Sequence, residues 1–143
     1  MIVARILAAK GRDVVTTQPY RTLAEAAALL TGRNIGAAVV TDAQGRVLGM
    51  LSERDILHAV GMGGAAALDD AVAKHMTTPV VTTDEDECVH VAMEKMTLRR
   101  CRHLPVVVDE KLVGIESIGD VVKHRLEQIE HEYQAMRDYI ATA

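Results

Sequence analysis

"GIESIGD" at residues 114–120 and "GMLSERD" at residues 49–55 share a glycine, a serine and an aspartate at the same internal spacing. The sequence before them repeats as well. "VVTT" occurs at residues 14–17 and again at 80–83, and each time an amphipathic stretch, two apolar runs around a polar turn and the Gly-Ser-Asp junction follow. Such internal similarity predicts two copies of one supersecondary unit.

Each copy is typical of a strand, a helix, two strands and a second helix. The helix after "VVTT" has apolar residues at i, i+3, i+4 and i+7, the spacing of one helix face. These residues are Leu23, Ala26, Ala27 and Leu30 in the first copy and Val89, Ala92, Met93 and Met96 in the second. One unit alone leaves apolar surface uncovered. We therefore expect a mixed α/β (α+β) fold in which the two β-α-β-β-α copies pack as a pseudo-twofold pair.

The predicted organisation has four parts. Residues 1–60 form the first copy together with a short N-terminal helix in "MIVARILAAKG", and residues 74–125 form the second copy. The small residues of "GMGGAAALDDA" favour a linker over residues 61–73. Residues 126–143 extend the last helix beyond the repeat.

Composition excludes several classes of partner. The net charge of -4 argues against nucleic acid, which is bound through its phosphates by a basic surface. No stretch approaches the ~20 apolar residues of a membrane span. Two cysteines, Cys88 and Cys101, do not make a disulfide framework and suit a reducing compartment, so we expect a cytoplasmic protein. The six histidines show no i, i+4 pair of the kind found in helical metal sites, and we predict no metal.

The Ser-x-x-Asp junction has two interpretations. A serine at a helix N-cap and an acid three residues later form a capping box, which is purely structural. The same helix N-terminus presents free N–H groups to an anion, and the carboxylate can accept hydrogen bonds from a ribose diol. The two interpretations are compatible with each other. The recurrence of Ser52 and Asp55 as Ser117 and Asp120 favours the functional one.

The tandem pattern resembles a pair of cystathionine β-synthase (CBS) domains over nearly the whole chain. The two junctions match a family pattern of Gly, two apolar residues, Thr or Ser, two variable residues and Asp. "KHMTTPVVT" at 74–82 resembles the segment that leads into a second copy, and "CRHLPVVV" at 101–108 resembles the strand before the turn. Two departures stand out: Glu116 occupies an apolar position of the pattern, and Val39 stands where the second copy has Pro105. Glu116 either faces solvent or adds negative charge near the second junction.

The resemblance implies a regulatory module without catalytic cofactor that binds adenine nucleotides in clefts between the copies. AMP is the first expectation, and ATP, NAD(H) and S-adenosylmethionine are further ones. Asp55 and Asp120 would hold ribose, and Ser52 and Ser117 would lie near phosphate. The adenine would sit against the segments that precede the paired strands and those that lead into each copy. These residues are Ile35, Gly36 and Ala37 with Asp13 and Val14, and Cys101, Arg102 and His103 with Pro79 and Val80.

The two clefts should differ. Arg102 and His103 can approach a phosphate in the cleft built on Asp120, whereas the cleft built on Asp55 has only Arg54 nearby. We therefore expect the Asp120 cleft to bind more tightly, and its binding to strengthen as His103 becomes protonated.

Two alternatives remain open for the function. One is a structural dimerisation module that binds no ligand, and the other is an enzyme that uses Cys101 and His103.

The C-terminal extension carries an apolar seam. Its residues are spaced by 4, 3, 4, 3 and 4 positions, as in a coiled coil. They are Val122, Leu126, Ile129, Tyr133, Met136 and Ile140. We expect a homodimer to which this helix contributes, together with a regulated partner protein that the sequence does not identify; packing of the seam on its own domain is the alternative.

Overall fold

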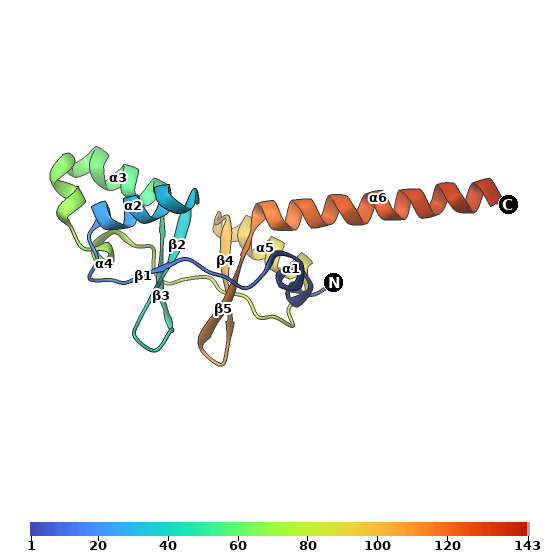
Figure 1. Cartoon of the computed structure of the whole chain (residues 1–143), viewed down its shortest axis with the longest axis horizontal. Helices are drawn as coiled ribbons and strands as arrows, with labels where there is room; N and C mark the ends of the chain where they lie inside the picture. Colours follow the sequence, from blue (N-terminus) through green and yellow to red (C-terminus); the bar gives the residue numbers. More distant parts are fainter. Residues whose placement is uncertain (143) are drawn as a thin grey trace.

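The computed structural model describes residues 1–142. The first copy consists of β1 (Thr16–Thr17), α2 (Leu23–Arg33), β2 (Ala37–Thr41), β3 (Val47–Ser52) and α3 (Glu53–Gly63). The second consists of α5 (Val89–Arg99), β4 (His103–Val108), β5 (Lys111–Ser117) and α6 (Ile118–Thr142). Helix α1 (Val3–Lys10) precedes the first copy, and the 3₁₀ helix η1 (Ala65–Asp69) and helix α4 (Val72–His75) join the two. The predicted mixed fold of two similar copies with a C-terminal helix is confirmed, and Figure 1 shows the two sheets side by side, with α2 and α3 next to the first and α5 and α1 next to the second.

The two sheets differ in one strand. In the first copy β1 runs parallel to β2, which is antiparallel to β3. In the second copy β4 and β5 are antiparallel, but the strand predicted at 80–83 is reduced to one bridge between Thr83 and Val106, so that prediction was wrong. In the first copy the Val39 amide donates a hydrogen bond to the Val15 carbonyl oxygen (3.3 Å). Pro105 occupies the position of Val39 and has no N–H to donate, so the ladder shortens.

Most residues of the helix faces predicted from apolar spacing are buried, and Ala27, Val89 and Met93 are half-buried. Leu23 and Ala26 of α2 belong to the core of the first copy, Leu30 of α2 is also buried, and Ala92 and Met96 of α5 belong to the core of the second copy. Local signals in the sequence fix where α2 begins and ends. Thr22 and Glu25 form a capping box at its N-terminus, and Asn34 adopts a left-handed conformation after its last turn.

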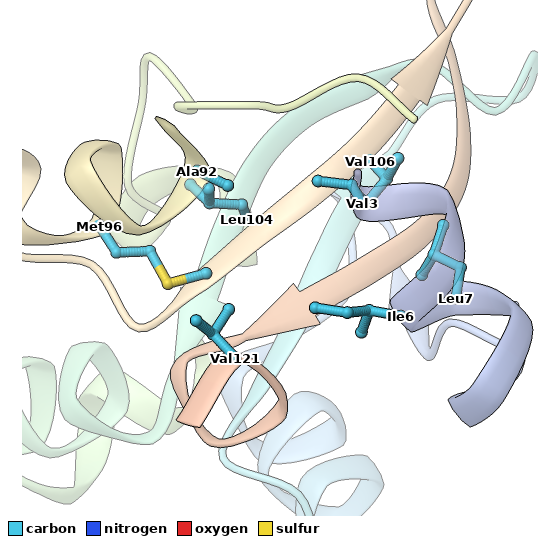
Figure 2. Packing of buried hydrophobic residues seen from close by; sticks show 8 residues of the cluster. All are labelled: Val3, Ile6, Leu7, Ala92, Met96, Leu104, Val106 and Val121. Atoms are coloured by element: carbon cyan, nitrogen blue, oxygen red, sulfur yellow. The ribbon is translucent and has the colours of Figure 1, made fainter. Parts of the chain in front are cut away.

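The segment that leads into each copy packs on the other copy. Val3, Ile6 and Leu7 of α1 lie in the second-copy core with Leu104 and Val106, as Figure 2 shows. Correspondingly, Val72 of α4 lies in the first-copy core. Residues 1–10 thus precede the first copy in sequence but belong to the second by packing, and each core includes residues of the segment that leads into the other copy.

This exchange explains the two junction glycines. A Cβ atom at Gly114 would lie 2.8 Å from a Leu7 methyl group of α1. A Cβ atom at Gly49 would lie 2.7 Å from the Met76 sulfur and 3.1 Å from the Thr77 carbonyl oxygen, in the segment after α4. The glycine in each junction therefore makes room for the chain that enters from the opposite copy.

The predicted linker is folded. Helix α3 continues to Gly63, η1 follows, and α4 begins at Val72, so most of residues 61–73 is helical. Ala67 and Val72 are buried in the first-copy core, which holds this stretch against the domain. The small residues therefore permit close packing here, and they do not mark an extended connection.

Helix α6 projects from the body of the molecule (Figure 1), and Val121 in its first turn is its buried residue. None of the helices in residues 1–142 has the length and hydropathy of a membrane span.

Candidate functional site

The first junction joins β3 to α3. The Ser52 amide and hydroxyl donate to Asp55 Oδ2 at 2.8 and 3.0 Å, and the Asp55 amide donates to Ser52 Oγ at 3.2 Å. The other carboxylate oxygen, Oδ1, accepts a weak hydrogen bond from the Thr77 hydroxyl at 3.4 Å. The structural interpretation as a capping box is therefore correct, and one oxygen of Asp55 faces the segment that leads into the second copy.

The second junction joins β5 to α6 and repeats this geometry. The Ser117 amide donates to Asp120 Oδ2 at 2.9 Å, and the Asp120 amide donates to Ser117 Oγ at 3.1 Å. Lys10, at the end of α1, places its ammonium 2.5 Å from the same Oδ2 and 2.9 Å from the Ile115 carbonyl oxygen. All the hydrogen bonds that the described residues make to the Asp120 carboxylate fall on Oδ2, which leaves Oδ1 for another donor.

Charge differs between the two junctions. Burial acts to raise the pKa of Asp120, but the Lys10 ammonium and the Ser117 amide outweigh it, so the pKa lies below the ordinary value. Asp120 is therefore an anion at neutral pH with a cation beside it. The corresponding partner of Asp55 is the neutral Thr77.

Glu116 lies beneath the second junction and is fully buried. The expectation of an exposed strand face is therefore wrong, because Glu116 matches Leu51, a core residue of the first copy that is also fully buried. Neither carboxyl oxygen of Glu116 has a hydrogen-bond partner among the described residues. Burial, and then the negative charge of Asp120, raise the pKa of Glu116 to about 7. At neutral pH this group is close to half protonated, so its charge near the second junction depends on pH.

The proposed base-contacting segment of the first copy lies at the start of β2. Ile35 and Gly36 line an open hollow of about 460 Å³, which also borders Glu53 and Ile56 of α3, while Ala37 is buried. The Glu53 amide donates to the Gly36 carbonyl oxygen at 2.8 Å. A Cβ atom at position 36 would lie 3.5 Å from the Glu53 carboxylate, and the glycine leaves this space open.

The matching segment of the second copy is polar. His103 lies opposite Ser117 in the β4–β5 ladder, and Arg102 is exposed. Burial, and then the charge of Lys10, lower the pKa of His103, while the carboxylates of Asp120 and Glu53 act in the opposite direction. His103 is therefore close enough to feel an acid from each copy, and in the free protein it is largely neutral at pH 7.

Cys101 does not have the surroundings of a catalytic nucleophile. Its side chain packs against the second-copy core, and burial raises the pKa of its thiol. A thiol that resists ionisation is a weak nucleophile.

The remaining predicted residues are exposed or half-buried. Val14 lines a second hollow of about 280 Å³, where β1 and the β2–β3 turn approach β5, and Asp13 beside it is exposed. Pro79 is exposed and Val80 is half-buried. Arg54 is exposed in the first turn of α3.

Three residues near the junctions were missed by the sequence analysis. Glu53 stands at the first position of α3, where the second copy has Ile118, and this difference is visible in the two aligned junctions. Lys10 and Thr77 reach the acids only because the leading segments cross to the opposite copy. No spacing in the sequence signals that crossing.

Comparison with known proteins identifies the repeated unit. The family model of the CBS domain matches residues 8–61 and again residues 71–127. Among curated relatives, the mitochondrial CBS domain-containing protein CBSX3 of Arabidopsis thaliana is 33% identical; the alignment covers 83% of this chain and 60% of that protein.

Solved structures agree with this match over most of the chain. The CBS-domain containing protein ATU1752 from Agrobacterium tumefaciens is 48% identical, with a TM-score of 0.83 over 87% of this chain and 92% of that chain. The CBS domain protein PAE2072 from Pyrobaculum aerophilum, complexed with AMP, is 33% identical, with a TM-score of 0.75 over 84% and 89%. The CBS domain pair of protein MJ0100, in complex with 5-methylthioadenosine and S-adenosyl-L-methionine, is 26% identical, with a TM-score of 0.80 over 90% and 98%.

Proposed function

The chain belongs to the CBS domain family, and we propose that it is a regulatory module that binds an adenine nucleotide between its two copies and signals occupancy to a partner protein. The observation that carries this proposal is the repeated junction, in which a serine caps a helix and the second carboxylate oxygen of the aspartate has no partner at Asp120 among the described residues and only a weak one, Thr77, at Asp55. The similar proteins complexed with AMP and with S-adenosyl-L-methionine support an adenosine ligand. AMP is our first candidate, followed by ATP, NAD(H) and S-adenosylmethionine.

Asp120 is the proposed ribose acceptor of the second cleft. Its Oδ2 is held by Ser117 and Lys10, so Oδ1 can accept from a ribose hydroxyl without loss of the helix cap. Hydrogen bonds to a charged acceptor contribute about 1.5–3 kcal/mol each. The Lys10 ammonium keeps the carboxylate ionised and offers a positive charge beside a phosphate. Asp55 has the same role in the first cleft, with Thr77 in place of the cation.

The clefts are proposed to be unequal because their helix N-termini differ in charge. The first position of α3 is Glu53, whereas the first position of α6 is the apolar Ile118. A carboxylate there opposes a bound phosphate, which a helix N-terminus otherwise favours. Arg102 and His103, which lie on the Asp120 side, further increase the difference in phosphate binding between the two clefts. Glu53→Ile should therefore strengthen AMP binding at the Asp55 cleft.

The adenine is proposed to lie against the segments that the family likeness indicates. For the Asp120 cleft these are Ile35, Gly36 and Ala37, with Asp13 and Val14. The hollow beside Ile35 and Gly36 supports this choice, since a ring needs an open and partly apolar surface. For the Asp55 cleft they are Cys101, Arg102 and His103, with Pro79 and Val80.

We further propose that the module has no catalytic activity, works as a homodimer and resides in the cytoplasm. The raised pKa of the Cys101 thiol argues against the enzyme alternative. Cys88 and Cys101 are both free, which suits a reducing compartment. The homodimer is supported by the exposure of the α6 seam, from 47% at Ile129 to 67% at Ile140.

Calorimetric titration against AMP, ATP, NADH and S-adenosylmethionine tests the proposal. At least one should bind and raise the melting temperature, because a ligand at 100 times its Kd stabilises the fold by about 2.7 kcal/mol. If none of the four binds, the nucleotide function is wrong, and the structural dimerisation module becomes the better interpretation.

A further inference from the structure

Helix α6 presents an apolar seam to solvent. The helix spans 25 residues, and its seam side chains are about half to two-thirds exposed. They are Val122, Leu126, Ile129, Tyr133, Met136 and Ile140. Beyond its first turn the helix projects away from the body (Figure 1). The alternating spacing of three and four residues assigns these side chains to the d and a positions of successive heptads.

The charged residues that flank the seam identify its partner. Arg125 and Glu132 precede a positions, and Glu130 and Arg137 follow d positions. In a parallel, in-register pair of such helices, the residue before an a position meets the residue five positions later on the other helix. Arg125 then faces Glu130 of a second copy, and Glu132 faces Arg137. Both contacts are attractive, and each occurs twice because the pair has twofold symmetry.

An antiparallel pair is disfavoured by the same residues. If Val122 lay opposite Ile140 of a second copy, residues at equivalent flanking positions would meet each other. Glu130 would face Glu130, and Glu132 would face Glu132, so like charges would meet at the centre of the pair. Lys123 would also face Arg137. The flanking charges are therefore self-complementary in only one of the two orientations.

We propose that the α6 helices of two copies of this chain pair in parallel and in register as a two-stranded coiled coil. The inference rests on the proposed homodimer and specifies its geometry. Arg137 already lies beside the seam, with its guanidinium 5.9 Å from the centre of the Tyr133 ring. The pairing begins next to the second cleft, because Val122 follows Asp120 by two residues in the same helix. A change at the Asp120 junction would therefore reach the first turn of the dimer contact directly.

Disulfide trapping in the full chain tests the orientation. All proteins carry Cys88→Ser, because Cys88 is exposed and could cross-link by itself. Ile140→Cys places a thiol near the free end of α6, where a parallel pair brings the two thiols together. An antiparallel pair separates them by roughly 27 Å, given the helical rise of 1.5 Å per residue. Asp138→Cys is the matched control, because residue 138 lies on the outer face of the same turn.

The expected result is rapid dimer cross-linking of the Ile140→Cys protein under mild oxidation and little of the Asp138→Cys protein. A dimer by sedimentation that does not cross-link at position 140 would overturn the parallel geometry. A monomeric chain, or a dimer that persists in a chain ending at Arg125, would overturn the pairing of α6 altogether. Nucleotide titration on the same proteins reports separately on the proposed ligand function.

Charge reversal provides a second measurement. Glu130→Lys with Glu132→Lys makes both predicted contacts repulsive in the parallel pair, and dimerisation should weaken by about tenfold or more. In an antiparallel pair the same changes only replace glutamate–glutamate repulsion by lysine–lysine repulsion, so the dimer affinity would stay the same. An unchanged dimer affinity would therefore contradict the proposal.

Discussion

Glu116 makes a direct prediction about stability, because it is a fully buried carboxyl group at a position where the first copy has Leu51. Its pKa is raised from the usual 4.5 to about 7 by burial first and by Asp120 second. Lys10 acts against this rise and Glu87 adds to it. A group whose folded pKa is raised favours the folded state when it is protonated. Its contribution is therefore lost as the pH rises from about 4.5 to about 7 and beyond.

The difference between the folded and the usual pKa corresponds to about 3 kcal/mol. The free energy of unfolding should therefore fall by this amount between pH 4.5 and pH 8 because of Glu116 alone. Glu116→Leu removes the titration and restores the residue of the first copy. The variant's gain in the free energy of unfolding over the original chain should therefore be about 3 kcal/mol larger at pH 8 than at pH 4.5.

Urea unfolding over this pH range measures the effect. His103 titrates in the same range with the opposite sign, since its pKa is lowered, but it is present in both proteins and cancels in their difference. Glu116→Gln should show the same flattened profile, and Leu51→Glu should gain a pH dependence in the first copy. If the stability difference between the Leu variant and the original chain is the same at pH 4.5 and pH 8, Glu116 does not titrate as a buried carboxyl group with a raised pKa.

Three further predictions follow from the packing and the charges. Gly114→Ala places a methyl group 2.8 Å from Leu7 and should destabilise the fold by about 1–3 kcal/mol, and Leu7→Ala in the same chain should recover part of that loss in chemical denaturation. Arg102→Ala should weaken AMP binding more than Arg54→Ala, and a larger loss for Arg54→Ala would reverse the assignment of the two clefts. A phosphate beside His103 should raise its lowered pKa, so AMP affinity by calorimetry should increase from pH 8 to pH 6, and this dependence should become weaker in His103→Asn, which leaves the part that comes from Glu116.

Much of the fold follows from local patterns in the sequence. Apolar spacing identified the buried faces of α2 and α5, and the repeat of the junction identified the two-copy fold. The strand predicted at 80–83 does not form, because the proline at position 105 has no amide N–H to donate to it. That consequence becomes visible only when the pairing partner is known.

The two helix-capping junctions of the candidate site were predictable from the sequence, but the residues that contact them were not. Ser52, Asp55, Ser117 and Asp120 could be found because their spacing recurs. Lys10 could not be assigned to Asp120, because the contact depends on α1 crossing to the opposite copy. The burial of Glu116 could have been read from its alignment with Leu51, since matching positions of a repeat share an environment.

We propose that the two junction acids hold the ribose of an adenine nucleotide in addition to capping their helices. Calorimetry of AMP and of 2′-deoxy-AMP on the original chain, Asp120→Asn and Asp55→Asn tests it most directly, because asparagine retains a capping oxygen but not the charge. Asp120→Asn should weaken AMP binding by about tenfold or more, and 2′-deoxy-AMP should suffer a similar loss on the original chain. Unchanged AMP affinity in both variants, accompanied by lower melting temperatures, would show that the acids serve only as caps and would contradict the claim.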